Sequence, residues 1–406
     1  MVQLGSQPFS DAATQVVRDI RDAVRAALGA APGMPERAQA VADSLKIDLN
    51  LAWKLVNVIR TPDPFAAAQQ LPGSGGLEIF LEAAAACGVP SDRLANCRAA
   101  FKNFEALIEI HAGDRAALDS MFGHLASRGS ERADLAARRA AFKANAAIVG
   151  VQSRVQVTTY LLHPTASDAE RYDVTMLRGF VGLQRLRGDI GWIIGRTRHS
   201  DDALPDVSNQ RRPLDPEAAA AHHGVPLIAR SCSTPMPVFR RTLGADKMFA
   251  DELVEGPVGK TAALTFFTGE TILTAGNRRG LDDQSHLRIA AGCHTPVESM
   301  VVDLLVHADL TTLVDPSFSL VSELGGAQVH STPPERFSRL PTCETLEQAG
   351  RGADELDIAE HPRYIELLTD AANTVSVNLR DFNAHRVRIK FPPIPCSAVV
   401  QWKVSM

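Results

Sequence analysis

The stretch 149-VGVQSRVQVTTYLL-162 decides how this chain is organised, because apolar and polar residues begin to alternate there. A period of two is typical of a β-strand with one buried face. Before it, residues 1–148 are rich in Ala, Leu and Arg at helical spacing, with breaks at Pro- and Gly-rich sites. The sequence therefore predicts an all-helical domain over 1–148 and a strand-rich, mainly antiparallel α+β domain over 149–406.

The size and composition of the chain agree with two folded domains. It has 406 residues and a mass of 43.7 kDa. Chains of this length usually form more than one domain, each with its own hydrophobic core. Apolar residues make up 45% and charged residues 22%, so wholesale disorder is excluded. The net charge is −5, and contact with nucleic acid therefore requires a local basic patch.

The chain carries no recognisable signal for membrane insertion or secretion. Residues 1–15 lack the basic flank and apolar run of a signal peptide, and no window approaches the ~20 apolar residues that span a bilayer. Six cysteines are scattered without any C-x-x-C spacing, as expected for reduced thiols in a bacterial cytosol. We therefore expect a cytoplasmic protein with no membrane partner.

Three features of the second half bear on its architecture. The run 265-TFFTGETILTA-275 has Thr-Gly-Glu at its centre, which predicts a hairpin. Residues 196–216 are polar and interrupted by prolines, which predicts a long exposed loop of the kind that often carries function. Residues 362–381 are expected to form a helix whose apolar face covers one side of the sheet.

A second informative stretch, 41-VADSLKIDLNLAWKLV-56, fits two short helices that cross at a tight turn. Ala42 lies at a position of the first helix that requires a small side chain, and Asp48 can cap the second helix. Lys46 lies at the turn position that usually holds Gly, so it would need a positive φ. The expected buried stripe of the second helix consists of Ala52, Leu55 and Val56.

This segment, at about 36–60, resembles the helix-turn-helix unit of bacterial DNA-binding transcriptional regulators, and the resemblance extends to no other part of the chain. It implies that the second helix enters the major groove of a DNA duplex, with Leu49 near the groove. Trp53 is expected to pack beside the interior stripe. The residues expected to read base edges are Asn50, Lys54 and Asn57. The residues expected to hold phosphates are Arg37, Lys46 and Arg60.

The same pattern recurs 42 positions later, within 83–98. Its matching positions are Ala84, Gly88, Val89, Leu94 and Cys97, which repeat the offsets of Ala42, Lys46, Ile47, Ala52 and Leu55. The repeat predicts either paired DNA-reading units or two helical hairpins that pack on each other. Residues 1–150 carry 16 basic and 16 acidic residues, so DNA binding would depend on where the charges lie.

Polar side chains in the second half allow weaker interpretations. Cys293 and His294, with His307 and Asp309, form the most concentrated polar set and would be the centre of a metal-dependent hydrolase. Metal ligands must converge, and adjacent residues on a regular strand point to opposite sides. Because no motif fixes a metal geometry, ordinary core or surface histidines are the favoured interpretation, and no metal is predicted.

Other catalytic motifs are incomplete. Gly259-Lys260-Thr261 resembles the end of a phosphate loop, but Val254 stands where that loop needs Gly. The only nucleophile candidate in a strand-to-loop position is the Ser231-Cys232-Ser233 run, and no second element is evident to activate it. The basic residues Arg386, Arg388 and Lys390 alternate along one strand and are expected to form a solvated face.

These observations favour a cytoplasmic DNA-binding transcriptional regulator with a C-terminal sensing or assembly domain. Its expected partners are double-stranded DNA and a second copy of itself, because a regulator that reads a two-fold site dimerises. No cofactor is expected. One alternative is a non-enzymatic structural protein that forms a homo-oligomer. The other alternative is the metal-dependent hydrolase centred on the β domain.

Overall fold

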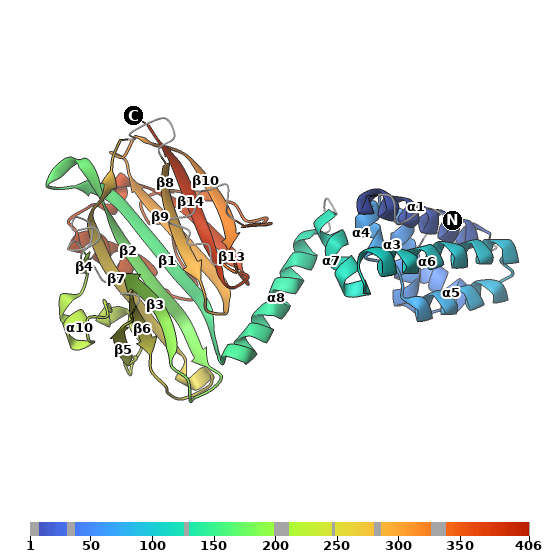
Figure 1. Ribbon diagram of the computed structural model, residues 1–406, viewed down its shortest axis with the longest axis horizontal. Helices are drawn as coiled ribbons and strands as arrows, with labels where there is room; N and C mark the ends of the chain where they lie inside the picture. Colours follow the sequence, from blue (N-terminus) through green and yellow to red (C-terminus); the bar gives the residue numbers. More distant parts are fainter. Residues whose placement is uncertain are drawn as a thin grey trace. The chain divides into compact units, whose positions relative to one another are not determined.

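The computed structural model describes residues 8–30, 37–125, 130–198, 211–245, 248–279, 286–325 and 338–405. Helices come first and strand-rich sheets follow, so the chain is a mixed α+β protein, as predicted (Figure 1). It divides into an N-terminal unit, 1–136, and a C-terminal unit, 137–406. The division falls inside helix α8 (Ser130–Val149), whereas the sequence pattern changes at the end of that helix.

The N-terminal unit is helical throughout its described residues. Its helices are α1 (Phe9–Gly29), α2 (Ala38–Leu45), α3 (Leu49–Arg60), α4 (Pro64–Ala68), α5 (Ser74–Ala86), α6 (Ser91–His111) and α7 (Arg115–Leu125). One continuous core joins them, because each helix buries an apolar stripe at spacings of three and four residues. Along α1, for example, Val16, Ile20 and Val24 are fully buried.

The C-terminal unit is built on strands. The longer ones are β1 (Val151–Thr165), β2 (Asp168–Arg185), β3 (Trp192–Arg198), β7 (Leu264–Asn277), β8 (His286–Cys293), β9 (Val297–His307), β10 (Leu313–Ser322), β13 (Phe382–Lys390) and β14 (Cys396–Val404). The shorter ones are β4 (Arg211–Pro213), β5 (Phe239–Leu243), β6 (Met248–Leu253), β11 (Arg339–Leu340) and β12 (Glu347–Arg351).

Among the described residues these strands form three sheets. The largest has the order β12-β13-β9-β1-β2-β7-β4, the second β11-β10-β14-β8 and the third β3-β6-β5. Every pairing between described strands is antiparallel except that of β1 with β9, which confirms a mainly antiparallel architecture. Figure 1 shows β1 and β2 as long neighbouring strands at the centre of the unit.

Both faces of the seven-stranded sheet are covered. Along β9, Val302 and Leu304 lie in a core shared with Ile289 of β8 and Trp402 of β14, so the second sheet covers that face. Alternate residues of β9 enter a different core with helix α11 (Tyr364–Thr374) on the opposite face. A strand with apolar residues on both faces reads as a continuous apolar run, as β9 does.

Several finer predictions are settled here. The predicted hairpin at 265–275 was wrong, because β7 runs straight through Gly269 as one strand. The predicted helix at 362–381 is present as α11 and covers the sheet, but it ends at Thr374. Most of the predicted loop at 196–216 lies outside the described residues. None of the described helices combines the length and apolar character needed to cross a membrane.

The remaining short elements lie beside the sheets. They are the helix α10 (Pro216–Ala221) and the 3-10 turns η1 (Ala229–Ser231), η2 (Lys260–Ala262) and η4 (Leu379–Asp381). Asp215 caps α10, because its side chain accepts a hydrogen bond from the backbone N–H of Ala218 at 3.0 Å. Its other carboxylate oxygen accepts from the N–H of Ala229 at 3.1 Å, which joins the starts of α10 and η1.

Candidate functional site

The turn between α2 and α3 has the predicted backbone geometry. Lys46 is in the left-handed region with φ 53° and ψ 42°, so the expected positive φ is confirmed. The N–H of Ile47 donates to the carbonyl oxygen of Ala42 at 3.1 Å, which closes the turn. The Asp48 side chain accepts from the N–H of Asn50 at 2.8 Å, as an N-cap should. These contacts fix where α3 begins.

Helix α3 has one buried and one exposed side. Its buried residues are Ala52, Leu55, Val56 and Val58, which include the predicted stripe. At about 100° per residue, the remaining polar and exposed residues fall within an arc of roughly 140°. This arc, which we call the α3 face, consists of Leu49, Asn50, Trp53, Lys54, Asn57 and Arg60. The structure thus places all three predicted base-reading residues on one side of the helix.

The prediction for Trp53 was wrong. Its side chain is 50% exposed and lies within the α3 face, not against the interior. Leu49, one helical turn earlier, is 48% exposed. At about 100° per residue Trp53 lies about 40° from Asn57 and Leu49 about 80°, so the exposed apolar surface and the polar base-reading candidates share one side of the helix.

Basic residues lie along the α2–α3 pair: Arg37 is the N-cap of α2, Lys46 lies in the turn, and Arg60 ends α3. Arg37, Lys46 and Arg60, the predicted phosphate contacts, are all exposed. Residues 37–60 contain four basic side chains and two acidic ones, Asp43 and Asp48, so this segment has a net charge of +2 within a chain of net −5. The local charge balance therefore favours an anionic partner here.

Helix α1 holds the C-terminal end of α3. The Arg21 guanidinium donates to the carbonyl oxygens of Val58 at 3.1 Å and Thr61 at 2.6 Å. Burial lowers the pKa of Arg21, and Arg25 adds to this effect. Because carbonyls at a helix end have no partner within the helix, these contacts satisfy them and anchor α3 to α1.

The second sequence match also forms a helix pair with a left-handed turn. Gly88 has φ +79°, and the N–H of Val89 donates to the carbonyl oxygen of Ala84 at 3.1 Å. The two turns touch each other, because the Cys87 thiol donates to the carbonyl oxygen of Ser44 at 3.4 Å. The α2–α3 and α5–α6 pairs therefore pack together within one core.

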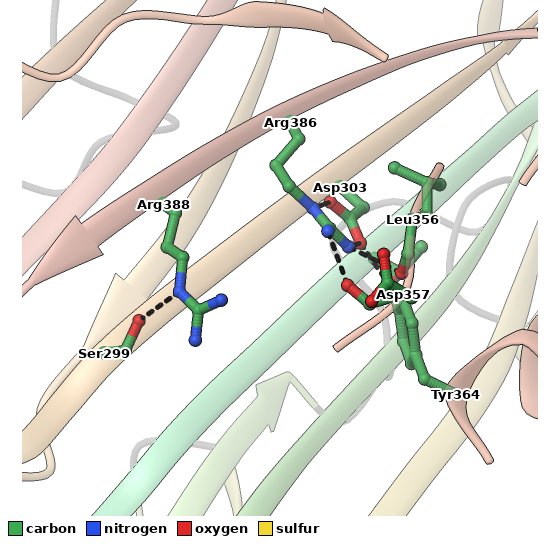
Figure 2. Close-up of polar contacts among 8 residues, drawn as sticks. Ser299, Asp303, Leu356, Asp357, Tyr364, Arg386 and Arg388 are labelled. Carbon is green, nitrogen blue, oxygen red and sulfur yellow. Dashed lines mark hydrogen bonds and ion pairs between the residues drawn. The ribbon is translucent and has the colours of Figure 1, made fainter. Parts of the chain in front are cut away.

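A charged network of the C-terminal unit is buried beside α11. Arg386 on β13 forms two contacts with Asp303 on β9, each 2.7 Å, and donates to the carbonyl oxygens of Leu356 and Asp357, both at 2.8 Å. The Tyr364 hydroxyl donates to Asp303 at 2.6 Å. Figure 2 shows the side chains of Arg386 and Tyr364 converging on the fully buried Asp303 carboxylate.

The prediction that Arg386, Arg388 and Lys390 form a solvated face was therefore wrong for Arg386. Arg386 is mostly buried, and burial would lower its pKa, but the hydrogen bonds with Asp303 raise it. Burial raises the pKa of the Asp303 carboxyl, and Arg386 opposes this rise. Arg388 pairs with Glu360 at 2.7 Å and contacts Ser299 at 3.0 Å, apart from Arg386 in Figure 2. The network joins β9, β13 and α11.

The proposed metal set does not converge. His294 precedes β9 and His307 ends it, so a strand of roughly 30 Å separates them. His294 contacts Glu323 at 2.5 Å, whereas the ring of His307 lies 3.8 Å from Asp309. Cys293 is buried opposite Cys396 on β14. Within the described part of the chain, no three His, Cys, Asp or Glu side chains are grouped to hold a metal.

The predicted nucleophile run lines a cavity beside α11. Ser231, Cys232 and Ser233 share a cavity of about 240 Å³ with His361, a residue that sequence reasoning missed. Burial raises the pKa of Cys232, and its thiol donates to the carbonyl oxygen of Ile228 at 3.4 Å. A reactive cysteine needs the opposite shift, toward the thiolate.

A second cavity of about 410 Å³ adjoins the first. The two share the ion pair of Arg230 with Asp370, whose N–O distance is 2.8 Å. Leu214, Ile228 and Leu367 line the larger cavity, with Asp215 and Glu217 beside them. Its volume lies within the range of small-molecule sites.

No protein-family model matches the chain, and no curated protein matches it. Among solved structures, one from Parabacteroides distasonis ATCC 8503, described as a "putative protease", is similar at a TM-score of 0.30 and 10% sequence identity. The alignment covers 63% of this chain and 40% of that one. A similarity at this level identifies neither the fold nor the activity of the chain.

Proposed function

We propose that the protein is a DNA-binding transcriptional regulator whose N-terminal unit places α3 in the major groove of a DNA duplex. The observation that supports this most is the α3 face, where Asn50 is exposed and Lys54 and Asn57 are partly exposed, near basic residues. Asn can bond adenine through two hydrogen bonds, and Lys can bond guanine. Arg37, Lys46 and Arg60 would contact phosphates on either side.

The C-terminal unit would sense a ligand or mediate assembly. The two adjoining cavities beside α11 are the natural place for a small effector, because they combine an apolar wall with charged side chains. The regulator would act in the cytoplasm as a homo-oligomer, since two-fold operators are read by dimers.

The test measures binding of the full-length protein to fluorescent duplexes by anisotropy. A random-sequence duplex is used first, at 50 and 200 mM salt, and tight-binding duplexes are then selected from a randomised pool. Binding to the random duplex should weaken steeply with salt, because displaced counterions drive it. Binding that is absent at low salt would contradict the proposal.

Two variants separate base reading from phosphate contact. Arg37→Ala should reduce the slope of log affinity against log salt by about 1, because Arg37 is one of the expected phosphate contacts. Asn50→Ala should weaken binding to the selected duplex about 10- to 100-fold while leaving the random duplex nearly unaffected. The matched control is K102A/N103A on α6, outside the α3 face, which should bind like the wild type.

A further inference from the structure

The apolar residues of the α3 face, Leu49 and Trp53, lie toward one edge of its arc, beside Asn57 and Asn50. Leu49 and Trp53 are 48% and 50% exposed, and they lie one helical turn apart. Asn50 and Asn57 flank Trp53 on the same face, at three and four residues from it. Two neighbouring exposed apolar side chains next to polar and basic ones are compatible with a surface that binds a partner.

The surrounding charges indicate which partner this is. Residues 37–60 have a net charge of +2, and none of the four basic residues that make up this charge points into the core. A protein–protein interface is usually depleted of charged residues at its centre and polar at its rim. A basic rim around an apolar strip on a helix fits the major groove, where phosphates line both edges.

The major groove of DNA offers one apolar group, the C5-methyl of thymine. We infer that Trp53, with Leu49 beside it, contacts thymine methyl groups, while Asn50 or Asn57 bonds the adenines next to them. This inference rests on the proposed function and adds the class of sequence that the protein reads: duplexes with thymine in each half-site. Trp53 is then a specificity-determining residue.

Replacing thymine by deoxyuridine tests the inference, because the exchange removes the methyl group and leaves the Watson–Crick edge unchanged. The duplex is the one selected by the wild-type protein, and each thymine is exchanged in turn. For the wild type we expect one or two positions where the exchange weakens binding about fourfold per methyl. For Trp53→Ala we expect weaker binding to the thymine duplex and no response to the exchange at those positions.

The matched control is Ile79→Ala on α5, an apolar side chain that is 53% exposed and lies outside the α3 face. It should respond to the exchange as the wild type does. Because Trp53 is half-exposed, its variant is expected to fold, and Trp53→Leu provides a second, apolar substitution. A circular dichroism spectrum equal to the wild type confirms that either variant is folded.

The possible results differ in what they refute. A selected duplex without thymine in its half-sites, or equal binding of the uracil and thymine duplexes, overturns the role of Trp53 but leaves DNA binding intact. A methyl effect that persists in both Trp53 variants has the same consequence. A change of oligomeric state in Trp53→Ala, with the methyl effect unchanged, would assign the strip to a contact between copies. Absence of any DNA binding refutes the proposed function itself.

Discussion

Replacing Arg386 by Met should destabilise the C-terminal unit more than most single substitutions. The change removes both contacts to Asp303, and this fully buried carboxylate keeps the hydrogen bond from the Tyr364 hydroxyl. It also removes the donors of two carbonyl oxygens. Breaking a buried ion pair from one side costs about 3–5 kcal/mol, so we expect a loss of that size in the free energy of unfolding.

Urea denaturation monitored by tryptophan fluorescence measures this loss in one unit. The chain has three tryptophans, Trp53, Trp192 and Trp402, and the last two lie in the C-terminal unit. In a Trp53→Phe background the emission therefore reports that unit alone. The variant should show a lower midpoint with an unchanged slope, because the surface exposed on unfolding stays the same.

The penalty should depend on pH with a definite sign. Burial raises the pKa of Asp303, and without Arg386 that rise is opposed only by the hydrogen bond from Tyr364 and the charge of Arg388, which are weaker influences. A carboxyl whose folded pKa exceeds its unfolded value, about 3.9 for Asp, costs no stability below that value and costs more as pH rises toward the folded pKa. The gap between wild type and Arg386→Met should therefore be smaller at pH 5 than at pH 8.

A second substitution isolates the charge. D303N/R386M replaces the carboxylate by a neutral amide, so it should be more stable than Arg386→Met alone and should lack the pH dependence of the gap. The reasoning would be refuted if Arg386→Met cost less than about 1 kcal/mol at both pH values, since that is the cost of an exposed pair.

Three further outcomes follow from backbone geometry. Lys46→Gly should stabilise the N-terminal unit by about 1 kcal/mol in urea denaturation, because Gly tolerates the left-handed turn. The same change should weaken DNA binding, because it removes a phosphate contact. A loss of stability would contradict the argument that Lys46 is strained. Asp48→Ala should cost about 1 kcal/mol through loss of the N-cap, measured by thermal unfolding against Asp43→Ala as control. Gly179→Ala should destabilise the C-terminal unit, since a Cβ there would lie 2.3 Å from the Phe267 ring; an unchanged melting temperature would show that the ring can move aside.

Local patterns in the sequence were enough to predict the order of the elements. The period-two alternation after Val149 and the helical spacing before it gave the α+β class, and the turn position of Lys46 predicted its positive φ. Such signals are reliable because a helix or strand repeats its geometry every few residues, so a buried face has to appear as a period. The hairpin expected within β7 was wrong because no local signal shows that a strand continues through Gly269.

Side-chain partners depended on the tertiary structure. Arg386 looked like part of a solvated strand face, and only the order β13-β9-β1 brings it to Asp303, 83 positions away in the sequence. His294 and His307 looked close, yet β9 holds them at opposite ends. The sequence spacing of Trp53 places it beside the buried stripe of α3. Its exposure depends on which helices pack against α3 in the folded unit. Periodicity determines which face of an element is buried, whereas the packing of distant elements determines what each side chain contacts.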